Sequence, residues 1–232
     1  MSDLTIYENG VYLENNPLWH VEESSWKVCQ VMRMLNRHSL RPRTISDVGC
    51  GAGEVLRQLQ SQMDPECLFC GYEISPQAFE LCLSRANDRL QFKLLNIRQE
   101  KGVLFDLILA LDVIEHLEDY FSFLRDIKPK SQYKIFHIPL DASIQTLLRP
   151  NGLLKRRNLY AHLHYFTKET ALRTLEDVGY EVLDWCYTPR SIEFATAPME
   201  KILKFPRKFF FALQHDLSVR VLGGFSLLAL AR

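Results

Sequence analysis

Apolar residues recur along the chain at spacings that alternate between those of helices and those of strands. Over residues 21–36, Val28, Val31, Met32 and Leu35 repeat at helical spacing with charged residues between them, which predicts an amphipathic helix. Short apolar runs typical of buried strands follow at 44–49, 67–74, 90–97, 105–113, 132–140, 180–187 and 223–232. Helices are predicted between these strands at 54–63, 75–87, 120–127 and 168–179. Strands alternating with helices indicate an α/β protein with a doubly wound, mostly parallel sheet and helices on both faces.

Two of the predicted helices carry end signals. Ser75 is a suitable N-cap and Pro76 suits the first helical position, where its missing N–H costs nothing. Gly179 is placed to end the helix at 168–179. These signals support the predicted boundaries at both positions.

Two longer segments interrupt the alternation. Residues 141–167 are predicted to be irregular, and residues 190–222 are predicted to be helical, with Pro206 interrupting a long amphipathic face. We expect one domain over residues 1–232, with residues 1–40 forming a cap or lid and a helix. Both interruptions are then insertions on one side of that domain.

Composition limits the classes of function. Twenty-eight basic residues balance twenty-eight acidic ones, so no overall field favours nucleic acid or an anionic membrane as partner. The start of the chain lacks the pattern of a signal peptide, and no apolar run reaches membrane-spanning length, so a cytoplasmic location is expected. The six cysteines form no disulfide framework, and Cys67 and Cys70 lack a second half-site for zinc. No metal site is predicted.

A glycine-rich loop lies between the first strand and the following helix. Gly49, Gly51 and Gly53 allow a sharp turn there and let a ligand approach the backbone closely. The position is also where ligands bind in doubly wound sheets, near the point at which the strand order reverses. Two ligand classes fit the loop: a dinucleotide and S-adenosylmethionine.

Three charged residues bear on that choice. The spacing is G-x-G-x-G instead of the dinucleotide pattern G-x-G-x-x-G. Glu54 occupies the position where the dinucleotide pattern has its third glycine, and its negative charge is expected to repel a pyrophosphate. Asp47 suits a cationic ligand. Glu73 ends the second strand, where it can accept hydrogen bonds from ribose hydroxyls, but dinucleotide enzymes use the same device.

With "DVGCGAGEVLRQL", "GYEIS" and "FDLILALDVIEHLED" in this order, the chain resembles the class I S-adenosylmethionine-dependent methyltransferases. It is most similar to the bacterial group that includes quinone-biosynthesis and polysaccharide-cluster enzymes. The likeness extends over about residues 19–187 and implies a Rossmann-like, seven-stranded sheet whose last strand is antiparallel.

The resemblance also implies which residues hold the cofactor. Asp47, Gly49, Cys50, Gly51 and Gly53 match positions around its amino-acid end. The remaining implied cofactor residues are Glu73 at the ribose, Ile74 and Asn96 at the adenine, and Ala110, Leu111 and Asp112 beside the methionine moiety. Trp19 and His20 either close over the cofactor or, together with Trp26, hold the first helix on the domain.

Histidines are the candidates for the chemistry of methyl transfer. His162 and His164 share one face if the chain is extended there, so either can contact the acceptor or act as a base. His116 matches a Glu-His pair of the family and is a third candidate. His137 lies in an apolar strand and is expected to be a core histidine. A metal at His162 and His164 lacks an evident third ligand.

Two basic stretches are candidates for acceptor recognition. Arg149, Lys155, Arg156 and Arg157 either hold a phosphate or carboxylate or are solvated. Residues 201–214 mix lysines with phenylalanines and either contact a membrane or pack on the domain. The resulting hypothesis is methyl transfer from S-adenosylmethionine, which becomes S-adenosylhomocysteine, to oxygen of a small-molecule or carrier-linked acceptor. An NAD(P)-dependent oxidoreductase and a non-catalytic cofactor-binding protein are the alternatives.

Overall fold

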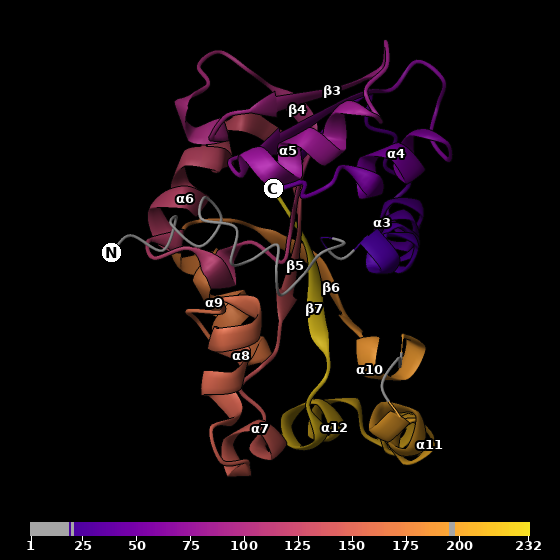
Figure 1. Cartoon of the computed structure of the whole chain (residues 1–232), viewed down its shortest axis with the longest axis vertical. Coiled ribbons are helices and arrows are strands. Elements are labelled where there is room, and N and C mark those ends of the chain that lie inside the picture. Colours follow the sequence, from indigo (N-terminus) through magenta and orange to yellow (C-terminus); the bar gives the residue numbers. More distant parts are fainter. Residues whose placement is uncertain (1–18, 20, 195–197) are drawn as a thin grey trace.

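The computed structural model of this 232-residue chain describes Trp19, residues 21–194 and residues 198–232. The described residues form a seven-stranded sheet in the order β3-β2-β1-β4-β5-β7-β6 (Figure 1). Its strands are β1 (Thr44–Val48), β2 (Leu68–Glu73), β3 (Leu90–Leu94), β4 (Phe105–Leu111), β5 (Ser131–Pro139), β6 (Val182–Thr188) and β7 (Ser226–Ala231). Strands β1 to β5 pair in parallel, whereas β7 lies antiparallel between β5 and β6. The predicted doubly wound sheet with an antiparallel last strand is confirmed.

Helices cover both faces of the sheet. The longer elements of the first part of the chain are α3 (Ser24–Arg37), α4 (Glu54–Gln60), α5 (Pro76–Leu83), α6 (Tyr120–Ile127) and α9 (Lys168–Asp177). Successive side chains of β4 face opposite sides of the sheet. Leu107 and Leu109 pack with α3 and α4 on one side, and Ile108 packs with α6 and α9 on the other, so each face of the sheet has its own core. Val28, Val31 and Leu35 of α3 are buried in the first of these cores, as their spacing predicted.

The predicted end signals are confirmed. The Ser75 hydroxyl accepts a hydrogen bond from the Ala78 N–H at the start of α5, with Pro76 as its first residue. Gly179 follows α9 with a φ of +88°, a left-handed conformation that favours glycine.

The segment 141–167 is not irregular, so that prediction is wrong. It contains α7 (Ile144–Leu148) and α8 (Gly152–Tyr160), followed by a stretch without regular secondary structure that leads to α9. Helix α8 has no buried residue. A helix without a buried face has no apolar periodicity, which is why the sequence pattern did not indicate it.

The segment 190–222 is helical, as predicted. It forms α10 (Arg190–Glu193), α11 (Pro198–Leu213) and α12 (His215–Leu222), which gather with α7 at one end of the molecule (Figure 1). Helix α11 continues through Pro206, so the predicted interruption is wrong. Pro206 and the residue one turn before it, Ile202, are both exposed, so water can satisfy the carbonyl that proline leaves without a donor. Among the described residues, no helix combines the length and the apolar character needed to cross a bilayer.

Candidate active site

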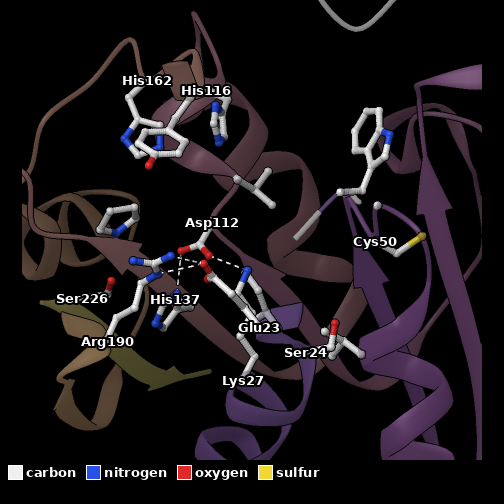
Figure 2. A pocket seen from close by; sticks show the side chains of 18 of the residues that line it. Glu23, Ser24, Lys27, Cys50, Asp112, His116, His137, His162, Arg190 and Ser226 are labelled. Atoms are coloured by element: carbon white, nitrogen blue, oxygen red, sulfur yellow. Dashed lines mark hydrogen bonds and ion pairs between the residues drawn. The ribbon is translucent and has the colours of Figure 1, made fainter. Parts of the chain in front are cut away.

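A cavity of about 290 Å³ opens at the carboxyl ends of β1, β2, β4 and β5 (Figure 2). It lies where the strand order reverses, with β2 on one side of β1 and β4 on the other. The 3-10 helix η1 (Val21–Glu23), α3, α8, the stretch after α8 and α10 complete its walls. The sheet, the amino-terminal helices and both long segments therefore meet at one site.

The glycine loop forms one wall of this pocket, and its three glycines have different surroundings. All three have positive φ, with values of +69° at Gly49, +55° at Gly51 and +77° at Gly53. A Cβ atom on Gly53 would lie 2.5 Å from the Phe92 ring, so this glycine permits close packing against β3. A Cβ atom on Gly51 would meet nothing nearer than the Trp19 carbonyl oxygen at 3.8 Å. Gly51 is thus the glycine that leaves open space on the pocket side.

Glu73 links this loop to the end of β2. One carboxylate oxygen accepts a hydrogen bond from the Gly51 N–H at 2.8 Å, and the other accepts from the N–H groups of Ile74 and Ser75. Burial raises the pKa of Glu73, although the hydrogen bonds from Ser75, Gly51 and Ile74 oppose the rise. The side chain lines the pocket, so its remaining lone pairs face a ligand there.

Asp47, near the carboxyl end of β1, lines the pocket. The residue is 3% exposed, and its Oδ1 atom has no hydrogen-bond partner among the described residues. Burial raises the pKa of Asp47 to about 7, against the opposing charge of Lys27. A buried carboxylate oxygen without a donor is costly unless a ligand supplies one. Asp47 is therefore suited to bind a cationic, hydrogen-bond-donating group.

Lys27 of α3 joins Asp112 and His137 in a charged cluster at the pocket wall (Figure 2). The Lys27 ammonium lies 2.6 Å from Asp112 Oδ2, and His137 Nδ1 lies 2.6 Å from Asp112 Oδ1. The other His137 nitrogen is 2.9 Å from the Thr188 hydroxyl, so His137 is the satisfied core histidine that was predicted. Burial would raise the pKa of Asp112, but the charges and hydrogen bonds of His137 and Lys27 hold it well below its usual range. This cluster gives the carboxyl end of β4 a fixed shape.

Ion pairs also connect the amino-terminal helices to the segment after β6. Arg190 of α10 pairs with Glu23 of η1, and both side chains line the pocket. Glu193 accepts hydrogen bonds from the Trp26 indole at 2.7 Å and from Gln30 at 2.9 Å. Trp26 therefore holds α3 on the domain, the structural role that was one of the two predictions for the aromatic residues here.

The three candidate histidines do not share one wall. His116 and His162 line the pocket side by side (Figure 2), with ring centroids 4.9 Å apart. His164 is absent from the lining, because its Nε2 atom donates to the Leu117 carbonyl at 2.9 Å and its ring packs on Tyr120. A shared face for His162 and His164 was expected only for an extended chain, and residues 161–167 do not form a strand.

Some of the other residues that were predicted to contact the cofactor line the pocket, and others do not. Trp19, Gly49, Cys50, Ile74, Leu111 and Asp112 line the pocket. Gly53, Ala110 and Asn96 do not, and the Asn96 side chain instead accepts a hydrogen bond from the Arg98 N–H. His20 lies outside the described residues. Sequence reasoning missed Lys27, Glu23 and Arg190, which are brought to the pocket by tertiary packing and carry no local motif.

The role predicted for Glu54 is also changed by the structure. Its carboxylate lies 2.6 Å from Arg57 and 2.9 Å from Arg85. The hydrogen bond from Arg57, with those from Gln58 and Arg85, lowers the pKa of Glu54 to about 2 despite partial burial. Because two guanidinium groups offset its charge, Glu54 is not a strong barrier to a pyrophosphate. The glycine spacing remains the sequence argument against a dinucleotide.

Comparisons with known proteins agree with this geometry. Residues 46–130, which include the glycine loop, Glu73, Asp112 and His116, match the family model of a methyltransferase domain. Residues 46–130 therefore belong to a methyltransferase domain. The ajmaline N-methyltransferase of Rauvolfia serpentina is 30% identical over 95 residues, which are 38% of this chain and 32% of that enzyme. The match thus spans about a third of the length of that curated relative.

Solved structures show the same fold as this methyltransferase domain. The N-methyltransferase NodS from Bradyrhizobium japonicum WM9, in complex with S-adenosylhomocysteine, gives a TM-score of 0.58 at 17% identity, covering 90% of this chain and 86% of NodS. The magnesium protoporphyrin IX methyltransferase ChlM from Synechocystis PCC 6803, with bound S-adenosylhomocysteine, gives 0.59 at 16% identity, covering 94% and 86%. The [4+2]-cyclase SpnF also matches, at 0.58 and 16% identity over 86% and 80% of the two chains. At these identities the likeness establishes the fold, and the reaction has to be argued from the site.

Proposed function

We propose that the protein is an S-adenosylmethionine-dependent methyltransferase that transfers the methyl group to oxygen of a small-molecule or carrier-linked acceptor. Asp47 is the observation that carries the proposal. Its buried Oδ1 atom lacks a donor among the described residues and lies in the same pocket as the open backbone at Gly51. The ammonium group of an amino acid supplies both the charge and the hydrogen-bond donors that this oxygen lacks.

Neighbouring residues would hold the rest of the cofactor. Glu73, fixed by three backbone N–H groups, would accept the ribose hydroxyls with its remaining lone pairs. Ile74 lines the pocket directly after Glu73 and would lie against the adenine. The family model covers these positions, and NodS and ChlM were solved with S-adenosylhomocysteine.

The residues of this chain serve mainly to position the reactants. S-adenosylmethionine supplies a methyl group already activated by the sulfonium, so alignment of the acceptor oxygen provides much of the rate. Lys27 and His137 fix Asp112 and thereby the wall expected beside the methionine moiety. On the acceptor side, Arg156 and His162 come from the segment 141–167, and Arg190 comes from the segment 190–222. Both insertions thus contribute to the pocket, as expected for acceptor recognition.

Calorimetry with the reaction product tests the proposal. S-adenosylhomocysteine is expected to bind with one-to-one stoichiometry and micromolar or tighter affinity, whereas NADH is expected to give no heat of binding. The reverse result would support the oxidoreductase and refute the proposal. Tight product binding without methyl transfer from labelled S-adenosylmethionine to any cell-extract fraction would identify the protein as non-catalytic.

The affinity for S-adenosylhomocysteine should depend on pH through Asp47. The ammonium group of the ligand needs the carboxylate form of Asp47, and the pKa of about 7 means that this form is the minority at pH 6 and the majority at pH 8. The affinity should therefore rise about tenfold between these values. Since folding raises this pKa, Asp47 should also make the free energy of unfolding fall as pH rises from about 4 to about 7.

Calorimetry at pH 6, 7 and 8 checks the binding trend, with Asp47→Asn as the matched variant. The asparagine keeps the shape but has no titrating group, so its binding should be weaker and nearly independent of pH. An equal slope in the wild type and in Asp47→Asn would show that another group is responsible, with Lys27, Glu73 and Asp112 as the charged groups facing Asp47.

We also propose that the acceptor is reached from a membrane surface or a lipid carrier through α11. Ile202, Phe205, Phe209 and Leu213 lie on one face of this helix and are 61–78% exposed. Lysines at 201, 204 and 208 flank that face, the arrangement of a helix that lies in a membrane interface with anionic headgroups.

Replacing Phe205 and Phe209 together with serine should remove most binding to vesicles that contain anionic lipid, because two exposed aromatic anchors are lost. Vesicle co-sedimentation at low and high salt measures the effect. Leu104→Ser is the control, since Leu104 is 73% exposed but precedes β4 at the other end of the molecule (Figure 1). If the wild-type protein does not sediment with anionic vesicles at low salt, this contact is refuted.

A further inference from the structure

Three potential metal ligands converge at the acceptor side of the pocket. Glu115 and His116 belong to the 3-10 helix η3 (Ile114–His116) that follows β4, and His162 follows α8. Each offers a ligand atom within 4.8 Å of those of the other two. Figure 2 shows His116 and His162 at one end of the cavity, with Cys50 across from them. Glu115 is the third potential ligand, which the sequence did not make evident.

Both histidines are held through the same ring nitrogen. His162 Nδ1 lies 2.6 Å from Asp141 Oδ2, and Asp141 also pairs with Arg156 at 3.2 Å. His116 Nδ1 lies 3.3 Å from the carbonyl oxygen of Ala161. A carboxylate and a carbonyl only accept hydrogen bonds, so Nδ1 carries the proton in both rings and Nε2 carries the lone pair. Carboxylate or carbonyl partners of this kind orient histidines that bind metals.

Backbone hydrogen bonds to Glu115 hold the segment that carries His162 next to η3. The Glu115 carbonyl accepts hydrogen bonds from the N–H groups of Leu163 and His164, which ties the stretch after α8 to η3. Ala161 has a φ of +60°, a left-handed conformation that is strained for a residue with a Cβ atom. This turn brings the Ala161 carbonyl to His116 and places His162 beside it.

The Glu115 carboxylate is buried with little to stabilise its charge among the described residues. The residue is fully buried, and neither carboxylate oxygen accepts a hydrogen bond from the described residues. The nearest positively chargeable group is His116, whose Nε2 lies 3.8 Å from Oε1. Burial raises the pKa of Glu115 well above its usual range, and the charge of Asp112 adds to the rise. A cation next to these oxygens removes the cost of burying them.

We propose that Glu115, His116 and His162 bind a divalent transition-metal ion in the acceptor pocket. Two imidazoles and one carboxylate favour zinc, manganese, iron(II) or cobalt over magnesium and calcium, which prefer oxygen ligands alone. With three protein ligands, the ion keeps open positions for an acceptor.

The spacing of the three ligand atoms and their place in the acceptor pocket bear on how the ion would bind and act. Two donors on one ion lie at most about 4.2 Å apart, twice a bond of about 2.1 Å. The ligand atoms lie within 4.8 Å of one another, so a small movement of these side chains brings them within reach of one ion. The role in methyl transfer, which rests on the function proposed above, is to orient an acceptor hydroxyl and lower its pKa. Metal binding itself does not depend on that function.

Titration of the metal-stripped, full-length protein with Co²⁺ tests the site. The visible absorption of bound Co²⁺ should saturate at one ion per chain, and Zn²⁺ should displace it. His162→Ala and Glu115→Gln should each weaken Co²⁺ binding at least tenfold, the range seen when a metal site loses a supporting group. His164→Ala is the matched control, because this neighbouring histidine is bonded to the Leu117 carbonyl and should leave Co²⁺ affinity unchanged.

The outcomes separate this site from the proposed function. Thermal melting of each variant shows whether it is folded, and S-adenosylhomocysteine should bind His162→Ala as it binds the wild type. No Co²⁺ or Zn²⁺ binding below millimolar concentration in the wild type would overturn the proposal. Equal Co²⁺ affinity in the wild type and in both ligand variants would overturn it as well, because the ion would then be bound elsewhere. Metal binding without S-adenosylhomocysteine binding would retain the site and refute only the methyltransferase function.

Discussion

Replacing Gly51 with valine is expected to abolish binding of S-adenosylhomocysteine while the protein stays folded. A Cβ atom here meets no protein atom closer than 3.8 Å, so the side chain enters the space of the ligand instead of the core. The backbone φ of +55° adds strain of about 1–2 kcal/mol for a residue with a Cβ atom. Calorimetry should show an affinity at least about 100-fold lower, equivalent to roughly 2.7 kcal/mol.

Gly102→Val separates the effect on the ligand from the effect on the backbone. Gly102 has a φ of +74°, has no atom within 4 Å of an added Cβ and does not line the pocket. This variant should therefore lose similar stability but bind S-adenosylhomocysteine normally. Retained affinity in Gly51→Val would contradict the placement of the ligand against this loop.

Replacing Asp112 with asparagine should be the most destabilising single change at the site. Asparagine tolerates the φ of +58° at this position, so the backbone can stay in place. The change leaves the buried Lys27 ammonium without the carboxylate 2.6 Å away. Removing one partner of a buried pair costs about 3–5 kcal/mol. Because a quarter of the Asp112 side chain is exposed, solvent screens the pair and we expect a smaller cost, about 2–3 kcal/mol.

A double-mutant cycle with Lys27→Met isolates the pair. Urea unfolding of Asp112→Asn, Lys27→Met and the double variant gives the coupling energy, which should be at least about 1 kcal/mol. The double variant should be more stable than the sum of the single changes predicts, since no buried charge is left without its partner. Additivity within about 0.5 kcal/mol would show that the two groups do not stabilise each other.

The parts of the site that the sequence predicted are those encoded by local signals. The glycine loop, Glu73 at the end of a strand and the Ser75 cap each follow from a few consecutive residues. The sheet was predictable for the same reason, because apolar runs of strand length alternate with helical patterns. The glycine loop and Glu73 belong to the side of the pocket that we propose for the cofactor.

The acceptor side was less predictable because tertiary contacts build it. His162 meets His116 only because α8 ends in a left-handed residue and the following backbone bonds to Glu115. Lys27 lies in an amphipathic helix, where a lysine is ordinarily solvated, and becomes buried only when α3 packs over β4. Helix α8 has no buried face and therefore no periodic pattern. Long-range packing of this kind leaves no local pattern in one sequence.

A crystal structure of the protein with S-adenosylhomocysteine tests the central claim most directly. The account predicts that the ligand ammonium lies within hydrogen-bond distance of Asp47 Oδ1, with the amino-acid arm along Gly51 and the ribose hydroxyls on Glu73. It also predicts that the sulfur faces the end of the cavity that holds His116 and His162. A ligand bound elsewhere, or one whose ammonium does not contact Asp47, would contradict the account.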